Sequence, residues 1–492
     1  MTLHIPFDNS YQHLPEVFHS PAAPAPFSAR RLLAVNRELA EELRLPFGGY
    51  DENRLAGTFS GVEPPPGAAM LAQAYAGHQF GNFVPTLGDG RAVLLGEVMD
   101  RYGRRRDIHL KGAGRTSFSR SGDGLCPLGP ALREYLVSEA MHALGVPTTR
   151  ALALVLTDAT AWREQPKPAA VIARVAASHV RVGTFQYVAA RGDDDNVRRL
   201  ADYVIQRHYP ALAESDTPYR DLLAEIADRQ ARLITDWMRF GFIHGVMNTD
   251  NMAVSGETID FGPCAFMDEF RADARFSFID QHGRYAYANQ PSLALWNLSR
   301  LAEAILPLLD ADQDRAVAIA QDVLAGFMPD FEARWRKAMA AKIGLAETQE
   351  DDAALVQSLL EAMQQNRVDF TLMFRRLCDA VADPAANDGP RALFENDADW
   401  TAWEARWRRR LQAEAMNPGE RARRMRAVNP AVIPRNHWIE KAIRAAEDAD
   451  DFSVFERLRG PLIRPFEDTP DNADLVQPPA PAERVTQTFC GT

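Results

Sequence analysis

The spacing of hydrophobic residues divides the chain into a strand-like first part and a helical second part. Short apolar runs bounded by glycine, proline or charged turns predict strands in the first part. After residue 191 apolar residues recur at helical spacing, and most of 290–450 is predicted to be helical. The predicted strands are 92–98, 107–112, 151–157 and 169–176.

Three further helices are predicted before residue 290. One is a short helix over 29–43. Another covers 131–144, with Pro130 at its start and Gly145 at its end, as is usual for helix termini. The longest spans 221–242. The predicted core stripes are Leu132, Leu136, Ala140 and Leu144 on the second helix, and Leu222, Leu223, Ile226, Leu233, Ile234, Trp237 and Met238 on the third.

This order of elements favours an α+β fold with a small β-rich lobe over a larger helical lobe. Residues 1–70 are rich in proline and are predicted to be an N-terminal extension packed on the body. The β-rich lobe is expected to span 71–190 and the helical lobe 191–450. The remaining residues, 451–492, are predicted to form a C-terminal tail that is rich in proline and acidic residues.

Composition and charge narrow the class of protein. The 492 residues are 46% hydrophobic and 25% charged, which is typical of a globular protein with an ample core. A net charge of −12 argues against a dedicated binder of nucleic acid or anionic membranes. No apolar run is long enough to span a bilayer and no secretory signal is visible, so a cytoplasmic location is expected. The four cysteines are too scattered to predict a disulfide framework or a zinc site.

The candidate chemistry is concentrated in 244–262, HGVMNTDNMAVSGETIDFG. Asn251 and Asp260 offer hard oxygen ligands to a divalent metal that also binds phosphate oxygens. The intervening residues 252–259 predict two short strands turning at Ser255–Gly256, which would bring both ligands to the open end of a hairpin. An asparagine followed by a hairpin and Asp-Phe-Gly is typical of the metal-binding half of a kinase site.

A second group of candidates lies around the first two predicted strands. Gly88 and Gly90 precede strand 92–98, where a glycine loop would let backbone amides approach phosphates. Lys111 near the end of the next strand would add a positive charge, and Glu134 of helix 131–144 could face it. Each signal is weak alone, because two glycines are most often a turn and single charged residues are most often exposed.

Two arginines and a polar loop complete the candidate phosphate site. Asp123-Gly124 turns a loop rich in glycine and serine, and forms a backbone nest suited to an anion or a ribose. Arg174 lies within an apolar strand, where its burial is costly unless an anion or a carboxylate meets it. Arg181 follows in the exit loop. Together the arginines would suit a polyphosphate clamp, and a structural salt bridge is the alternative for each.

The order of these parts is that of a protein kinase: glycine loop, strand lysine, helix glutamate, two strands, long helix, then the metal motif. Two departures matter. Val246 stands where a kinase has its catalytic aspartate, and valine cannot accept a proton, so Asp250 is the nearest substitute. Arg91 stands where a small residue would let phosphates approach. A kinase-like site with a displaced base favours a nucleotide bound in a different pose.

Long blocks of the sequence closely resemble the SelO family of protein adenylyltransferases, and the resemblance covers essentially the whole chain. The blocks are YAGHQFGNFVPTLGDGRA, HLKGAGRTSFSRSGDG with LREYLVSEAM, ARVAASHVRVGTFQ, and GFIHGVMNTDNMAVSGETIDFGPCAF. The resemblance implies a bilobal, protein-kinase-like pseudokinase fold that binds ATP flipped, with the α-phosphate at the reacting centre. It also implies transfer of AMP from ATP, or of UMP from UTP, to Ser, Thr or Tyr hydroxyls of proteins, with release of pyrophosphate.

The same resemblance assigns roles to individual residues. Asp250 matches the family's proton acceptor, and Asn251 and Asp260 match its ligands for Mg²⁺ or Mn²⁺. Lys111 matches the phosphate-binding lysine, with Glu134 as its ion-pair partner. The positions that match the family's nucleotide contacts are Gly88, Gly90, Arg91, Lys111, Asp123, Gly124, Arg174, Arg181 and Asp260.

Two cysteines raise a redox hypothesis. Cys490 lies where many eukaryotic relatives carry selenocysteine, and Cys264 follows the Asp-Phe-Gly motif. A disulfide between them would tether the tail across the rim of the active site, and two free thiols are the alternative.

The expected partners are protein substrates and the enzyme itself as an acceptor, with neither nucleic acid nor membrane. A conventional kinase and an inactive ATP-binding scaffold are the rival functions.

Overall fold

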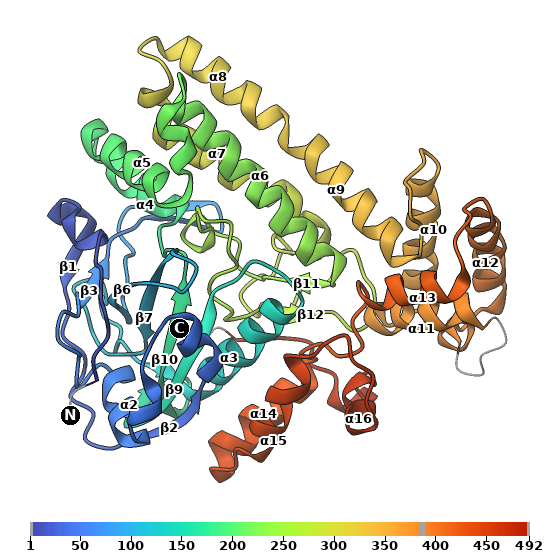
Figure 1. The fold of residues 1–492 in the computed structure, drawn as a ribbon, viewed down its shortest axis with the longest axis horizontal. Coiled ribbons are helices and arrows are strands. Elements are labelled where there is room, and N and C mark those ends of the chain that lie inside the picture. The colour runs from blue at the N-terminus through green and yellow to red at the C-terminus, as the bar shows by residue number, and fades with distance from the viewer. Residues whose placement is uncertain (1–2, 384–388, 490–492) are drawn as a thin grey trace.

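The computed structural model describes residues 3–383 and 389–489. One large sheet forms one end of the molecule and helices form the rest (Figure 1). All pairs of neighbouring strands in this sheet are antiparallel. In order across the sheet the strands are β1 (His19–Pro21), β3 (Leu71–Gln73), β6 (Ala92–Met99), β7 (Arg105–Lys111), β10 (Pro166–Ala176), β9 (Arg150–Trp162) and β2 (Arg30–Val35), with β8 (Cys126–Pro127) paired to β10.

The four predicted strands are confirmed as β6, β7, β9 and β10. The last two are longer than predicted, because their apolar inner parts continue outward into a polar hairpin that ends at Trp162 and Pro166. The register places Lys111 opposite Ala92 on one side and Ile172 on the other. The pattern predicted these strands because their inner residues are buried on both faces of the sheet.

The helix predicted over 29–43 is wrong in its first half. Residues Arg30–Val35 form strand β2 at an edge of the sheet, paired with β9, and only Arg37–Glu42 are helical (α1). The side chain of Asn36 accepts a hydrogen bond from Leu39 N and so caps the helix at its true start. Apolar residues at Leu32 and Leu33 suit either structure, and pairing with an open strand edge decides between them.

Helices cover both faces of the sheet. On one face Val171 and Ala173 pack in a core shared with α1 and with α2 (Glu52–Phe59). On the other face Ala170 and Ile172 pack in a core with α3 (Leu128–Ala143), and all four residues of its predicted stripe are buried. Alternate residues of one strand therefore serve two different cores.

The helical part of the chain packs around α6 (Pro218–Arg239), the predicted long helix, and all seven residues of its predicted stripe are buried. Helices α7 to α9 pack on it along the top of Figure 1, and α10 to α13 lie on the right, where α10 and α13 contact α9. The helices of this part are α4 (Val182–Ala189), α5 (Asp194–His208), α7 (Gln290–Leu309), α8 (Gln313–Ala325), α9 (Phe327–Lys342), α10 (Asp352–Gln365), α11 (Phe370–Ala382), α12 (Asp397–Gln412) and α13 (Pro418–Arg426).

The hairpin predicted over 252–259 is wrong in its pairing. The segment turns as expected, with Gly256 at a φ of +77°. Its two arms do not pair with each other: Ala253 forms a single bridge to Arg181, and Thr258 forms one to Thr148. Each arm therefore pairs with a residue from the sheet-rich part of the chain and not with the other arm. Two short pairs lie nearby, β4 (Gly77–Gln79) with β5 (Asn82–Val84), and β11 (Phe242–Ile243) with β12 (Ala265–Phe266).

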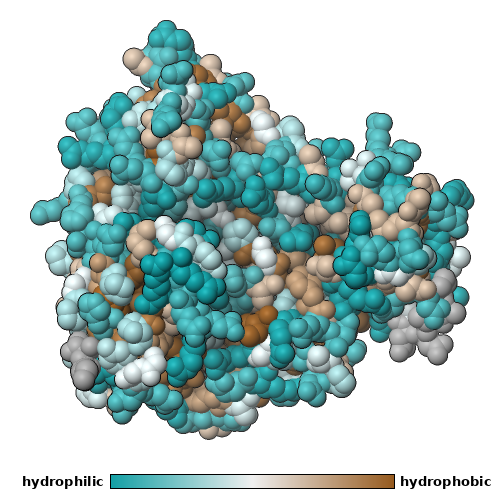
Figure 2. Space-filling view, in the orientation of Figure 1, coloured by the Kyte–Doolittle hydropathy of each residue, from teal (hydrophilic) through white to brown (hydrophobic). Residues whose placement is uncertain are grey.

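The C-terminal part returns to the sheet. Helices α14 (Asn436–Ala449) and α15 (Ser453–Leu462) pack on α3, and α16 (Ala473–Val476) follows them (Figure 1). Near the end, Thr488 pairs with Ser277. Hydrophilic side chains dominate the face in Figure 2, with apolar residues scattered among them. Across 3–383 and 389–489, no helix has the length and apolar character needed to cross a membrane.

Candidate active site

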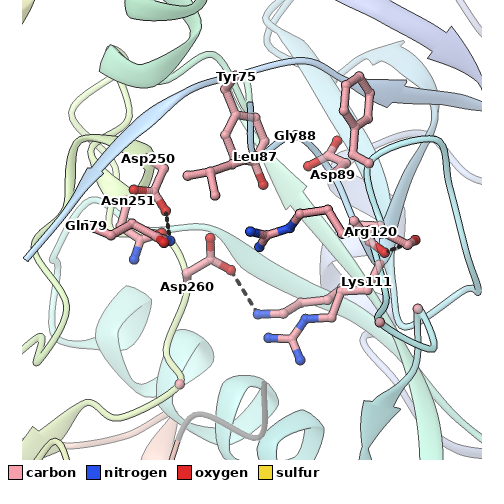
Figure 3. A pocket seen from close by; sticks show the side chains of 18 of the residues that line it. Tyr75, Gln79, Leu87, Gly88, Asp89, Lys111, Arg120, Asp250, Asn251 and Asp260 are labelled. Atoms are coloured by element: carbon pink, nitrogen blue, oxygen red, sulfur yellow. Dashed lines mark hydrogen bonds and ion pairs between the residues drawn. The ribbon is translucent and has the colours of Figure 1, made fainter. Parts of the chain in front are cut away.

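The predicted site residues line one cavity of about 950 Å³ (Figure 3). Its walls come from the glycine loop before β6, the strands β7 and β10, the loop 118–125, and the segment 246–262. The fold thus gathers groups that are far apart in the sequence. The predicted residues that line the cavity are Gly88, Gly90, Arg91, Lys111, Asp123, Gly124, Arg174, Arg181, Asp250, Asn251 and Asp260, together with Val246.

Lys111 is held between two carboxylates. It ends β7, and its Nζ donates to Glu134 Oε2 at 2.6 Å and to Asp260 Oδ1 at 2.8 Å. Helix α3 packs against β9 and β10 and so brings Glu134 to the lysine. Burial disfavours the charge, yet the two carboxylates keep the pKa of Lys111 raised. The ammonium is therefore charged and fixed in place.

Arg174 and Arg181 meet the same carboxylate. Arg174 Nη1 lies 2.7 Å from Asp260 Oδ1 and 3.3 Å from Glu134 Oε1. Arg181 Nη1 donates to Asp260 Oδ2 at 3.1 Å and to the backbone oxygen of Asp250 at 2.7 Å. Both arginine side chains are only 3% exposed. The structural salt bridges expected as the alternative are therefore present, and the same guanidinium groups also line the cavity where a polyphosphate would bind.

Asp260 occupies a strained position at the centre of this cluster. Its φ is +64°, a region that few residues other than glycine adopt. His244 Nε2 lies 2.8 Å from Ile259 O and steadies the preceding residue. Burial opposes ionisation of Asp260, but Lys111, Arg174 and Arg181 hold its pKa well below the ordinary value. The carboxylate is therefore ionised across the physiological range of pH.

A buried histidine supports the arginines from behind. Arg174 Nε lies 3.2 Å from His109 Nδ1, and His109 Nε2 lies 2.9 Å from Asp89 Oδ2. Because the guanidinium can only donate, His109 accepts at Nδ1 and donates at Nε2. The ring stacks on His179, with centroids 4.2 Å apart. This chain of hydrogen bonds from Arg174 to Asp89 was not predicted, although His109 and Asp89 both lie within the blocks that resemble the family.

Asp250 lies across the cavity from Lys111, on the far side of Asp260 (Figure 3). It belongs to a short 3-10 helix, Thr249–Asn251. Burial is the main reason that its pKa is raised to about 6. Among the described residues, no protein group donates a hydrogen bond to its Oδ1, and Gln79 Nε2 lies 3.5 Å from its Oδ2. An acid of this kind is ionised at neutral pH and poised to take a proton.

The β4–β5 hairpin covers Asp250 and was not anticipated as part of the site. Its His78 N donates to Thr249 Oγ1 at 2.7 Å, and Phe80 N donates to Tyr285 Oη at 3.2 Å. A Cβ at Gly77 would collide with Asp250 Oδ1, so only glycine leaves room for the carboxylate. The sequence of this hairpin is rich in glycine and polar residues, which could have suggested a loop near a ligand. Nothing in that sequence indicated that the hairpin would cover Asp250.

Asn251 and Asp260 fit a divalent metal that shares its ligands with phosphates. Asn251 Nδ2 donates to Val246 O at 2.9 Å, which leaves the amide oxygen as the atom that could bind an ion. Within the described ranges, no three His, Cys, Asp or Glu side chains gather closely enough to hold an ion by themselves. This is the arrangement expected for Mg²⁺, which usually takes one or two protein oxygens and fills its other sites with water and phosphate.

The remaining residues that were predicted to contact the nucleotide lie on the glycine loop before β6 and on the loop 118–125. Gly88 has a φ of +68°, and a Cβ there would collide with the ring of Phe118. Asp123 pairs with Arg163, with Nη1 2.8 Å from Oδ2. Arg91, Gly90 and Gly124 line the same cavity.

Of the two cysteines of the redox hypothesis, the structure describes only Cys264. Cys264 is buried, and its Sγ donates to Phe261 O at 3.3 Å. Cys490 lies outside the described residues, so the pairing stays a prediction. The nearest described part of the tail does reach this region, since Thr488 Oγ1 donates to Pro263 O at 2.6 Å.

Comparison with known proteins identifies the family. A family model described as protein adenylyltransferase SelO matches residues 1–462. A protein nucleotidyltransferase YdiU of Rhodopseudomonas palustris (strain BisB5) is 58% identical over 492 residues, which cover the whole of both chains. The protein of the same name in Bradyrhizobium diazoefficiens is 55% identical over 497 residues, again covering both chains completely. One from Rhizobium etli is 56% identical over 99% of this chain and 97% of its own. The chain therefore belongs to the SelO family of protein adenylyltransferases, which are nucleotidyltransferase enzymes.

Proposed function

We propose that the chain is a bilobal pseudokinase of protein-kinase-like fold that transfers AMP from ATP, or UMP from UTP, to Ser, Thr or Tyr hydroxyls of proteins. The enzyme itself is a further candidate acceptor, and the cytoplasm is its proposed location. The observation that carries the proposal is that one cavity has buried cations on one side and a candidate base on the other. Lys111, Arg174 and Arg181 are buried on one side, and Asp250 stands on the other with its pKa raised to about 6.

The buried cations support a flipped nucleotide. The γ-phosphate is the most highly charged end of ATP and is stabilised best where positive groups are fixed and shielded from water. Lys111, Arg174 and Arg181 offer that place, and the α-phosphate would then lie nearer the opening, toward Asp250. The phosphates would share the three cations that Asp260 now engages.

In the proposed reaction the acceptor hydroxyl oxygen forms a bond to the α-phosphorus. The bond between that phosphorus and the bridging oxygen of pyrophosphate breaks, and its electron pair leaves with pyrophosphate. The hydroxyl proton passes to Asp250, which is ionised at neutral pH. Lys111 and the two arginines stabilise the charge that develops on the leaving group. A divalent metal held by Asn251 and Asp260 would supply further positive charge at the phosphates.

Val246 weighs against the rival function of a conventional kinase. It lines the cavity where a kinase has its catalytic aspartate, and its side chain cannot accept a proton. The rival of an inactive scaffold does not explain why a buried carboxyl, Asp250, lines the cavity with its pKa raised to about 6.

Product analysis tests the proposal. ATP is incubated with the enzyme, Mg²⁺ or Mn²⁺, and a mixed protein substrate, and the small products are separated. Pyrophosphate formed in step with protein-bound AMP is the expected result. Release of ADP with phosphorylated protein would instead establish the kinase, and no turnover with ATP still bound would leave the scaffold.

A disulfide between Cys264 and Cys490 is proposed as a regulator of this activity. The bond from Thr488 to Pro263 supports it, because each of these residues lies within two positions of one of the cysteines. Mass mapping under non-reducing conditions should find the linked peptides after mild oxidation. Recovery of free thiols alone would end the hypothesis.

A further inference from the structure

A single exposed tryptophan forms part of the cavity wall. Trp162 ends β9 and is 70% exposed, the highest fraction among the large apolar residues that the structure describes. The other seven tryptophans of the chain are buried or partly buried. Trp162 also lines the cavity that holds the candidate phosphate site. An indole exposed at the edge of a binding cavity leaves its ring available to a ligand that stacks on it.

The tip that carries Trp162 is held rigidly. Arg163 Nη1 donates to the Trp162 backbone oxygen at 2.7 Å and to Asp123 Oδ2 at 2.8 Å. Its Nη2 donates to Leu125 O at 2.9 Å. One guanidinium thus joins the β9–β10 hairpin to the loop 118–125. The backbone at Trp162 is therefore tied to the loop that carries Asp123, the residue matched to a nucleotide contact, before any ligand arrives.

The cavity has a polarity that orients a nucleotide. The side chains of Lys111, Arg174 and Arg181 are at most 7% exposed, whereas that of Asp123 is 32% exposed and Trp162 is more open still. The charged phosphates belong at the buried, cationic end. The uncharged, planar base would then lie toward the open end, where Trp162 lines the cavity.

We propose that Trp162 is the stacking platform for the nucleobase and that it favours a purine over a pyrimidine. This inference rests on the proposed function for the orientation of the nucleotide. Aromatic side chains bind bases of any kind through stacking, and the gain grows with the stacked area. A purine covers more of the indole than a pyrimidine, so ATP gains more from Trp162 than UTP does.

Binding measurements with three ligands test the platform: ATP, UTP and inorganic tripolyphosphate, each with Mg²⁺. Substitution Trp162→Ala should weaken ATP binding about tenfold, the scale of one base–aromatic stack, and UTP binding less. Affinity for tripolyphosphate, which has no base, should not change. Trp162→Phe, which keeps a π face, should recover most of the ATP affinity.

Tyr102→Ala is the matched control. Tyr102 is 60% exposed at the turn between β6 and β7, so its substitution removes a comparable exposed ring away from the cavity. In wild-type protein, ATP should also quench the tryptophan fluorescence that Trp162→Phe removes, and tripolyphosphate should not.

Two results would overturn the inference. One is unchanged ATP affinity in Trp162→Ala. The other is an equal loss for ATP and tripolyphosphate, which would mean that the hairpin tip shapes the phosphate end. Binding is measured without turnover, so a Trp162-dependent ATP affinity would stand even if the transferred group proved to be the γ-phosphoryl.

Discussion

The two sides of the active-site cavity differ in how firmly their charged groups are held. On the sheet side, Lys111, Arg174 and Arg181 each bond to Asp260, and two of them also meet Glu134. On the loop side, Asp250 has a long hydrogen bond to Gln79, and no protein group among the described residues donates to its Oδ1. The charged groups of one side are fixed by many protein partners, and that of the other side by few.

The difference matches two chemical tasks. Groups that stabilise phosphate charge work best when they are oriented beforehand, so that no reorganisation is needed during the reaction. A group that takes a proton needs a pKa close to the working pH, and burial without strong partners is one way to raise that of a carboxyl. The four predictions below alter one side while leaving the other intact.

The largest effect is expected from removal of the base. Asp250→Asn keeps the shape of the side chain but cannot accept the proton, so transfer of AMP should fall by about 10²- to 10⁴-fold. Because the phosphate cations are untouched, ATP affinity should stay within about twofold of wild type. Transfer assays and equilibrium binding measure the two quantities separately. Retained activity would show that another group is the base.

Removal of the lysine should damage the opposite side. Lys111→Met deletes the charge but keeps the length of the side chain, and leaves Glu134 and Asp260 short of a buried partner. A loss of roughly 3–5 kcal/mol of folding free energy is expected for breaking such a buried pair. Chemical denaturation measures it. Lys337→Met, at an exposed position on α9, should change stability by less than about 0.5 kcal/mol; an equal loss there would contradict the account.

Asp250→Asn should also stabilise the fold, in a way that depends on pH. The folded pKa of about 6 lies above the ordinary value of 3.8, so ionisation of this buried carboxyl costs stability. That cost is absent below about pH 3.8, grows between the two values, and is complete above about pH 6. The variant should therefore gain roughly 2–3 kcal/mol at pH 7 and little at pH 4. A gain that did not depend on pH would point to packing instead.

The smallest effect is expected behind the arginines. His109→Leu should leave Arg174 Nε and Asp89 without their shared partner and weaken ATP binding by about tenfold, which corresponds to one lost buried hydrogen bond. His109→Gln, which can accept and donate at once, should restore part of the affinity. The matched control is His179→Gln, which alters the stacked partner that bonds to Asp107. If His179→Gln weakened ATP binding equally, the stack rather than Arg174 would be responsible.

Much of the fold could be predicted from local pattern. The inner strands are buried on both faces, so their apolar runs were visible, and the single-sided stripe of α6 was equally clear. Errors arose where pairing with distant segments decides the structure. Residues 30–35 join β9 at a sheet edge, and the arms of 252–259 pair with Arg181 and Thr148. Neither partner can be identified from the spacing of nearby residues.

The site residues were predictable to a different degree. Charged residues in unusual positions, such as Arg174 in an apolar strand, could be recognised as site candidates from the sequence. Supporting residues could not be recognised in this way. His109 and the hairpin over Asp250 act through contacts with residues more than 15 positions away in the sequence. Trp162 lay in the stretch that was predicted to be a turn between the strands 151–157 and 169–176. Such roles become visible only when the three-dimensional neighbours are known.

The most direct test of the central claim uses ATP labelled at either the α- or the γ-phosphate. Each form is incubated with the enzyme and a mixed protein substrate, and label is followed onto the substrate and onto the enzyme itself. If AMP is transferred, protein should acquire label from the α position only, and Asp250→Asn should lower that labelling by about 10²- to 10⁴-fold. Label from the γ position alone would contradict the flipped nucleotide and restore an ordinary kinase.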